Sequence, residues 1–223
     1  EVIACIYDEI YNFKKAFEEL TKVEENGKWG FIDKSGREVI PCIYDIEDAF
    51  DGVLTDAQRD GKWGCIDMSG KEVIPCLYDH IGSFDLGIAK IQKDKKWGFI
   101  NIIGEELVSC IYDSVSYFKD GYAEVKKSGK CGRINKNGKE VIPCIYDCIY
   151  FSDGFAKVEK DCKWGCIGMD GKVIIPCIYD KIGYWSSDGT VKVQKNGKWG
   201  FINKDGNEII PCIYDLIDYW EHD

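Results

Sequence analysis

The most constraining feature of this sequence is a motif that returns along the whole chain. The tetrapeptide Cys-Ile-Tyr-Asp, or Cys-Leu-Tyr-Asp, begins at residues 5, 42, 76, 110, 144, 177 and 212. Between its copies lies a Lys-Trp-Gly segment, with tryptophans at positions 29, 63, 97, 164 and 199. From Trp29 onward the period is 33 to 35 residues. Such a period is typical of tandem repeats, in which each unit buries its apolar side against its neighbours.

Each repeat predicts three short strands separated by two turns. Pairs such as Asn26-Gly27 suit two-residue hairpin turns, which need positive φ, whereas the equivalent pair Asp94-Lys95 fits such a turn less well. Alternation of apolar and polar residues and an abundance of β-branched side chains favour strands over helices. The proline that precedes most of the Cys-Ile-Tyr-Asp motifs lacks a backbone donor, so it predicts a sheet edge or a bulge.

We therefore expect an all-β fold of tandem repeats of about 34 residues, each with three to four short antiparallel strands. The predicted units of the single array 1–223 are roughly 1–37, 38–71, 72–105, 106–139, 140–172 and 173–207, with a half unit at 208–223. An open β-solenoid or stacked-hairpin array is favoured over a six-bladed β-propeller, because a closed ring needs matching counts of every segment, and the strand that carries Cys-Ile-Tyr-Asp occurs seven times against six copies of the Lys-Trp-Gly strand. Terminal strands of an open array are edges, through which the chain is expected to self-associate.

The repeats also act as substitution experiments within one molecule. An isoleucine after the Lys-Trp-Gly segment never varies, which predicts a buried position. The residue just before it is Phe31 in one repeat, Cys65 in another and Arg133 in a third. Because this position accepts arginine, we expect its side of the strand to be less enclosed.

Composition narrows the function classes. The net charge of −10 makes nucleic acid an unfavourable partner, and no apolar run is long enough to span a membrane. The chain has twelve cysteines, seven of them at one repeat position, which indicates small core residues rather than a disulfide ladder. Unpaired thiols favour a reducing, cytoplasmic location, although a start at Glu1, without methionine or signal features, leaves the cell surface open.

Catalytic motifs are absent from the sequence. His80 and His222 are the two histidines, and neither stands in a known catalytic order. We expect no enzyme activity, no cofactor and no metal site. The aspartate of each Tyr-Asp pair is predicted to cap the following turn by accepting backbone N–H bonds, while an acidic ladder that binds cations is the alternative.

Two sets of residues are candidate partner contacts. The first is the tryptophan row, which either packs between repeats or forms an aromatic surface: Trp29, Trp63, Trp97, Trp164 and Trp199. The second is the fourth repeat, where Cys131 replaces tryptophan and Arg133 replaces phenylalanine. Variation among equivalent positions makes one stretch of a repeat surface distinctive, so the fourth repeat is the first place to look for a partner.

The recurring Lys-Trp-Gly-Phe-Ile-Asp/Asn segment, the glycine after it and the Ile-Pro-x-x-Tyr-Asp segment resemble the WG repeat family, also called KWG repeats. This family occurs mostly in bacterial proteins, and the resemblance covers essentially the whole chain apart from Cys131, Arg133 and the positions where Ala4 and Ser109 replace proline. The resemblance implies a β-rich repeat fold but no activity.

We expect a non-enzymatic repeat scaffold that mediates protein–protein interaction, for example an inhibitor, an immunity-type protein or a targeting module. Its acidic surface favours a basic protein partner. A carbohydrate or cell-envelope binding module that uses exposed aromatic residues is the alternative.

Overall fold

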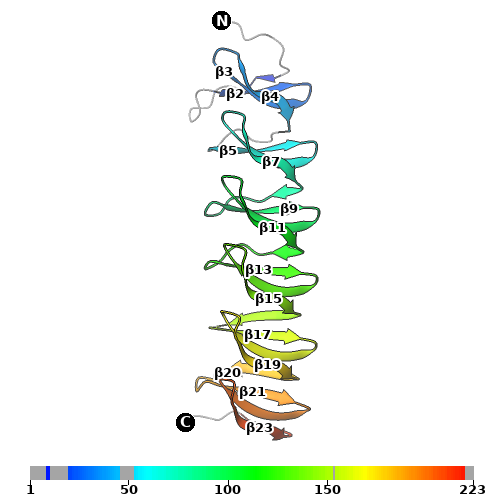
Figure 1. Ribbon diagram of the computed structural model, residues 1–223, viewed down its shortest axis with the longest axis vertical. Coiled ribbons are helices and arrows are strands. Elements are labelled where there is room, and N and C mark those ends of the chain that lie inside the picture. The colour runs from blue at the N-terminus through cyan, green and yellow to red at the C-terminus, as the bar shows by residue number, and fades with distance from the viewer. Residues whose placement is uncertain (1–8, 11–19, 46–52, 153, 219–223) are drawn as a thin grey trace. The chain divides into compact units, whose positions relative to one another are not determined.

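The computed structural model describes residues 9–10, 20–45, 53–152 and 154–218 (Figure 1). The packing divides the chain into two compact units, Glu1–Ile111 and Tyr112–Asp223, and each is treated by itself. The first Cys-Ile-Tyr-Asp copy, at residues 5–8, and His222 lie outside the described residues.

Unit 1 contains three small antiparallel sheets, in which strands follow one another in chain order. Sheet A consists of β1 (Glu9–Ile10), β2 (Leu20–Glu25), β3 (Lys28–Asp33) and β4 (Glu38–Tyr44). Sheet B consists of β5 (Leu54–Arg59), β6 (Lys62–Asp67) and β7 (Glu72–Tyr78). Sheet C consists of β8 (His80–Ile81), β9 (Ile88–Lys93), β10 (Lys96–Asn101) and β11 (Glu106–Tyr112). Tyr112, the last residue of β11, belongs to unit 2.

Unit 2 repeats this plan in three further sheets. Sheet D consists of β12 (Ser114–Val115), β13 (Tyr122–Lys127), β14 (Lys130–Asn135) and β15 (Glu140–Tyr146). Sheet E consists of β16 (Cys148–Ser152), β17 (Phe155–Lys160), β18 (Lys163–Gly168) and β19 (Val173–Tyr179). Sheet F consists of β20 (Lys181–Trp185), β21 (Thr190–Lys195), β22 (Lys198–Asn203) and β23 (Glu208–Tyr214).

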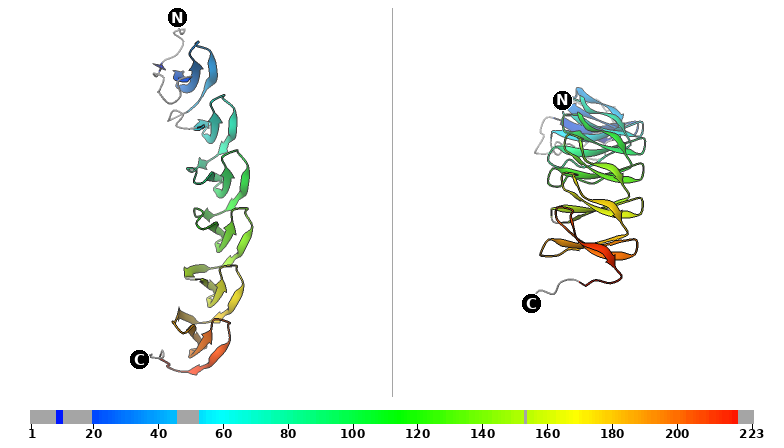
Figure 2. Two further views of the ribbon diagram at one scale, coloured as in Figure 1. Left: turned by 90° about the vertical axis from the view of Figure 1, so that its left-hand side faces the viewer. Right: turned by 60° about the horizontal axis from the view of Figure 1, so that its bottom comes forward.

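The predicted fold class is confirmed. Over the described residues the six sheets have three or four strands each, the strand pairs are antiparallel, and none of these sheets closes into a barrel. We call the strand that carries Lys-Trp-Gly, or Lys-Cys-Gly in β14, the Trp strand. The strand before it is the leading strand, and the strand after it is the closing strand. In unit 2 the sheets stack in chain order, as the green-to-red part of Figure 2 shows.

The first hairpin turn of each repeat requires two residues with positive φ. Asn26 and Gly27 have φ of 53° and 73°, which glycine and asparagine tolerate better than other residues. Asp94-Lys95 adopts the same turn, with φ of 52° and 62°. The stacking of the repeat therefore overrides the poorer local preference of Lys95.

The closing strand lies at the sheet edge and carries a bulge at its proline, as the sequence predicts. In sheet A the pairing runs from Trp29–Tyr44 to Phe31–Ile40, so three closing-strand residues stand opposite a single Trp-strand residue, Gly30. The bulged backbone lies directly over that glycine, because a Cβ at Gly30 would stand 2.4 Å from the carbonyl oxygen of Ile40. The glycine of the Trp-Gly pair is thus required by the closing strand.

The core lies between successive sheets. In unit 1, Tyr44 and Ile40 of sheet A pack with Ala57 and Ile66 of sheet B. In unit 2, Tyr146 of sheet D packs in the same way against sheet E. The invariant isoleucine is buried in every repeat, as predicted: Ile32, Ile66, Ile100, Ile134, Ile167 and Ile202.

The expectation that the preceding position is less enclosed is wrong. Phe31 and Cys65 are 3% and 0% exposed, and each packs in a cluster shared with the following sheet. In sheet B, Ile66 packs toward sheet A and Cys65 toward sheet C, so both faces of this strand are buried. Arg133 is tolerated because its guanidinium lies between two rings, 4.5 Å from the centre of Tyr122 and 4.6 Å from that of Phe151.

Polar links join successive sheets beside the apolar core. The Tyr78 hydroxyl donates to Glu106 Oε1 at 2.8 Å, from sheet B to sheet C. Asp147 accepts a hydrogen bond from the Lys130 ammonium of sheet D and from the backbone N–H of Asp161, in the first turn of sheet E. Asp79 and Asp180 make the same pair of contacts. These three aspartates therefore cap the next turn, as predicted, and also bind the lysine at the start of the Lys-Trp-Gly or Lys-Cys-Gly segment.

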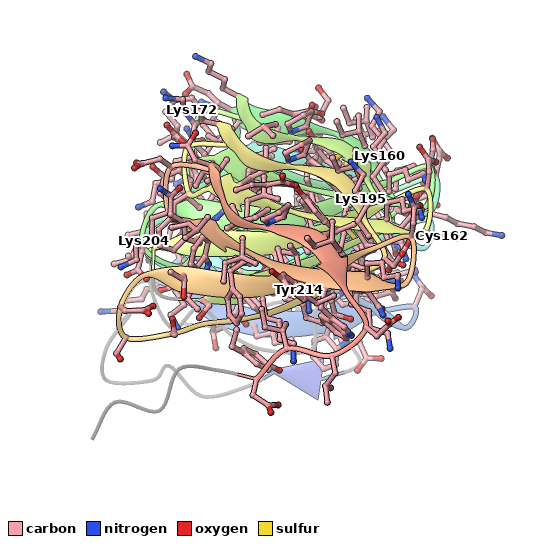
Figure 3. All side chains as sticks on the ribbon, turned by 90° about the horizontal axis from the view of Figure 1, so that it is seen from below. Lys160, Cys162, Lys172, Lys195, Lys204 and Tyr214 are labelled. Carbon is pink, nitrogen blue, oxygen red and sulfur yellow. The ribbon has the colours of Figure 1, made fainter. Side chains whose placement is uncertain are left out.

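The two kinds of turn lie at opposite ends of the strands. Figure 3 labels Lys160, Cys162 and Lys195 at one end of the sheets, beside the first turns, and Lys172 and Lys204 at the other end. Tyr214 of the last closing strand lies between these two ends, toward the viewer, and is 46% exposed.

Candidate functional site

The tryptophans of the predicted aromatic row are all half-buried. A leading-strand lysine lies over the indole ring in several repeats: the Nζ of Lys22 is 3.9 Å from the centre of the Trp29 ring, and that of Lys157 is 4.4 Å from the Trp164 ring. Trp29 and Trp164 also pack against the buried clusters between sheets. These two rings thus have a packed side and some surface left for contact.

The two predicted residues of the fourth repeat face the space between sheets D and E. Cys131 is half-buried, and its Sγ donates to the carbonyl oxygen of Asp147 at 3.6 Å. Arg133 packs its guanidinium on Phe151 of sheet E, and its Nη1 lies 3.9 Å from the sulfur of Met169. Its buried Nε has no hydrogen-bond partner among the described residues.

A recess lies one repeat further on, between sheets E and F. We call it the aromatic groove; its volume is about 670 Å³. Six aromatic residues line it: Tyr150, Phe151, Phe155, Trp164, Tyr184 and Trp185. Tyr150 stacks on Trp164 with ring centres 6.0 Å apart, and Phe155 lies 5.2 Å from Trp185. Of the predicted contact residues, the groove contains only Trp164.

The groove arises where the first strand of a sheet is longest. β16 and β20 have five residues each, whereas β8 and β12 have two. The extra length carries Tyr150 and Phe151 in β16, and Tyr184 and Trp185 in β20. A register shift between Ile182 and Trp185 displaces the intervening residues, and Tyr184 is left 86% exposed.

Two lysines give the groove its charge. Lys157 is half-buried at its wall and donates to the carbonyl oxygen of Ile182 at 2.6 Å. Burial lowers the pKa of the Lys157 ammonium, while the Trp164 and Tyr184 rings lie within 4.4 and 5.9 Å of its Nζ. Lys204 lies at the edge, and the described residues that line the groove include no carboxylate. The arrangement suits an apolar ligand that carries a negative charge.

Sequence reasoning missed most of this site. The available signal was the pair of adjacent aromatic residues after the Tyr-Asp motif, Tyr150-Phe151 and Tyr184-Trp185. The fourth repeat has such a pair, Tyr117-Phe118, without the longer strand, and the last copy has Tyr219-Trp220, which lies outside the described residues. The convergence of the first two pairs depends on sheets E and F stacking, which the linear pattern alone does not place.

Metal binding and thiol chemistry depend on the histidine, cysteine and carboxylate side chains. The described residues contain no group of three or more histidine, cysteine, aspartate or glutamate side chains arranged to hold a metal ion. Burial raises the pKa of the Cys42 and Cys144 thiols to about 11, so these thiols are protonated and weakly nucleophilic at neutral pH. His80 lies edge-on to Trp97, with ring centres 5.6 Å apart. Within the described ranges, all cysteines are free thiols.

Six small sheets in tandem with a repeated core define a protein of the all-β tandem-repeat class. The family model of the WG containing repeat matches residues 1–29, 29–46, 63–97, 97–131, 132–164, 164–199 and 199–223. The chain belongs to this family. No curated protein matched it.

Solved structures resemble the chain only loosely. Hsv2 of Kluyveromyces lactis is 9% identical, with a TM-score of 0.30, over 88% of this chain and 75% of that one. A eukaryotic initiation factor is 12% identical, with a TM-score of 0.35, over 95% and 67%. PorZ, a surface component of the type-IX secretion system of Porphyromonas gingivalis, is 8% identical, with a TM-score of 0.32, over 95% and 33%. Likenesses this weak carry no argument about function.

The search for membrane spans covered the described residues and found no helix with the length and apolar character to cross a bilayer.

Proposed function

We propose that this protein is a non-enzymatic repeat scaffold that binds another protein, and that the aromatic groove receives an apolar side chain from that partner. The observation that carries this proposal is the gathering of six aromatic rings around a recess of about 670 Å³. Rings that are half-exposed around an open recess are the usual anchors of protein interfaces, where a few tyrosine and tryptophan residues supply most of the binding energy.

The groove also specifies the chemistry of the inserted segment. Lys157 and Lys204 favour a carboxylate beside the apolar side chain, so the segment is an aromatic or aliphatic residue next to aspartate or glutamate. This local preference differs from that of the whole chain, whose net charge of −10 favours a basic partner. A partner that is basic overall and presents one acidic, apolar turn satisfies both. The free thiols support a reducing, cytoplasmic location for the encounter.

Affinity capture from the source cells tests the proposal, with three baits compared by mass spectrometry. The wild-type chain is expected to retain a defined protein. The double variant Tyr150→Ala/Tyr184→Ala is expected to lose it, because both rings line the groove and are exposed by 58% and 86%. Truncation of interface aromatic residues typically costs about 2 kcal/mol or more, which weakens binding roughly thirtyfold.

The matched control is Tyr117→Ala, a tyrosine that is 55% exposed in the same unit and does not line the groove. It is expected to retain the same protein as the wild type. Equal capture by all three baits, or no specific protein on any of them, contradicts the proposal.

Carbohydrate binding is the second candidate, and one observation favours it. Tyr150 and Tyr184 are exposed by 58% and 86% at the groove, and exposed aromatic rings are flat apolar platforms on which sugar rings can stack. A glycan array separates the two candidates. A signal that Tyr184→Ala removes supports the sugar, and a blank array together with a captured protein supports the scaffold.

A further inference from the structure

A second, smaller recess lies between sheets D and E of unit 2. We call it the Cys131 hollow; its volume is about 310 Å³, near the lower end of the range for ligand sites. Its walls are Cys131 and Val125 of sheet D, and Ile149 and Phe151 of β16 in sheet E. Ser116 and the flanking residues of β12 complete it.

The hollow and the aromatic groove occupy equivalent places in successive repeats. Cys131 in the hollow corresponds to Trp164 in the groove, since each follows the lysine of its Trp strand, and Ile149 corresponds to Ile182. Ser116 corresponds to Tyr150. The hollow therefore lacks the indole that the equivalent position carries in five other repeats, and Ser116 stands where the groove has the ring of Tyr150.

Internal comparison therefore identifies the shape that fits. The same backbone surroundings hold an indole at Trp29, Trp63, Trp97, Trp164 and Trp199. In the fourth repeat a thiol of much smaller volume stands there, and the space beside it opens to the surface. We propose that the Cys131 hollow receives a tryptophan side chain from a partner protein, so that the guest indole takes the place that the chain's own indole has in the other repeats.

Charged residues at the mouth of the hollow agree with an indole guest. Lys126 stands directly opposite Cys131 in the β13–β14 pairing, where the equivalent residue opposite Trp164 is Glu159. An ammonium beside an indole face is attractive. Glu124, opposite Arg133, also lines the hollow and offers an acceptor for the indole N–H. Both side chains are exposed, so the entrance is open to a partner.

This inference rests on the proposed function for the existence of a protein partner, but its test does not. The probe is free indole, followed by NMR chemical-shift changes in the ¹⁵N-labelled chain. We expect the largest changes at Cys131, Gly132 and Phe151. The variant Cys131→Trp fills the hollow with the chain's own ring and is expected to weaken indole binding at these positions at least about tenfold, a change of about 1.4 kcal/mol.

Two further variants make the outcome decisive. Cys131→Phe fills the hollow with a smaller ring and is also expected to weaken indole binding. It replaces Cys131→Trp in the test if circular dichroism shows that Cys131→Trp folds poorly. Tyr184→Ala alters the groove alone and is expected to leave indole binding at the hollow unchanged. Indole shifts that survive both filling variants overturn this inference.

The two proposals fail in different ways. Indole shifts confined to the groove and removed by Tyr184→Ala overturn the hollow and leave the groove proposal standing. Capture of a partner that Tyr150→Ala/Tyr184→Ala does not affect, but that Cys131→Trp abolishes, overturns the groove and supports the hollow.

Discussion

At the scale of single residues, the repeat is built on positions where one atom more would collide with backbone. The glycine of each Trp-Gly pair lies under the bulged closing strand. A Cβ at Gly98 would stand 2.3 Å from the carbonyl oxygen of Val108 and 2.9 Å from the amide nitrogen of Cys110. Backbone atoms of a paired strand have little freedom to move aside, so the collision is relieved only by breaking the bulge.

Gly98→Ala is therefore expected to lower the free energy of unfolding by about 1–3 kcal/mol or more, the usual range for overpacking. Urea denaturation followed by circular dichroism measures the loss. The control is Gly82→Ala, where the nearest atom to a new Cβ lies at 3.5 Å, and which should change stability little. Equal effects of the two substitutions would mean that the bulge yields easily.

The buried tyrosines before the aspartates give a second comparison. Tyr179 is 4% exposed and packs with Ile182 and Val193 of the next sheet, whereas Tyr214, its equivalent in β23, is 46% exposed. Tyr179→Ala is expected to cost about 3–5 kcal/mol, as for other large aromatic residues in cores, and Tyr214→Ala markedly less. Thermal or urea unfolding of both variants tests this, and a loss at Tyr214 as large as at Tyr179 would contradict the assignment of the core.

Residue-level prediction from sequence succeeded where one rule applied and failed where two sheets acted together. Constancy of Ile134 and its equivalents located the core correctly. The arginine at position 133 misled, because its guanidinium packs against the rings of Tyr122 and Phe151 and the side chain stays half-buried. A sequence pattern reports tolerance of a residue type, and that tolerance is not the same as exposure.

At the scale of elements, turns and strands follow from local chemistry. The asparagine–glycine turns, the alternating leading strands and the proline bulges were all foreseen. The lengths of β16 and β20 were not, because the residues after each Tyr-Asp motif vary and their pairing depends on the leading strand of the same sheet. The sequence analysis did not predict the groove around Tyr150 and Tyr184 for that reason.

The unfavourable turn in the third repeat yields a stabilising substitution. Lys95 holds φ at 62°, which costs a non-glycine residue roughly 1 kcal/mol. Lys95→Gly is expected to raise the free energy of unfolding by about 0.5 kcal/mol, the remainder being offset by the greater freedom of glycine in the unfolded chain. Lys93→Gly, in the neighbouring strand β9, should instead destabilise the chain. A denaturant midpoint that falls with Lys95→Gly would contradict this account of the turn.

At the scale of the whole molecule, carboxylates couple the stability of the repeats to pH. The Ser35 hydroxyl and backbone N–H groups hold the pKa of Asp33 at about 2. Hydrogen bonds from Lys62, Lys130 and Lys163 lower the pKa values of Asp79, Asp147 and Asp180. Carboxyl pKa values that are lower in the folded chain than in the unfolded one favour folding when the groups are ionised.

Stability is accordingly expected to be level from neutral pH down to about 4, the ordinary carboxyl range, and to fall as pH drops from there toward 2. Urea midpoints measured across this interval test the sign. Asp33→Asn provides the control, since Asn101 accepts the same two backbone hydrogen bonds in the third repeat, so the turn is kept and the titration is removed. Its curve should be shallower than that of the wild type; parallel curves would show that Asp33 does not contribute.

The aspartates that hydrogen-bond to two successive sheets constrain how the number of repeats can change in evolution. Asp79, Asp147 and Asp180 each accept hydrogen bonds from a lysine of one sheet and from a backbone N–H in the first turn of the next sheet. If recombination deletes or duplicates one full period, the aspartate at the new junction still has a lysine and a turn N–H as hydrogen-bond donors. Related genes should therefore differ in length by whole multiples of the period, while insertions of a few residues gather in the segment between the aspartate and the leading strand.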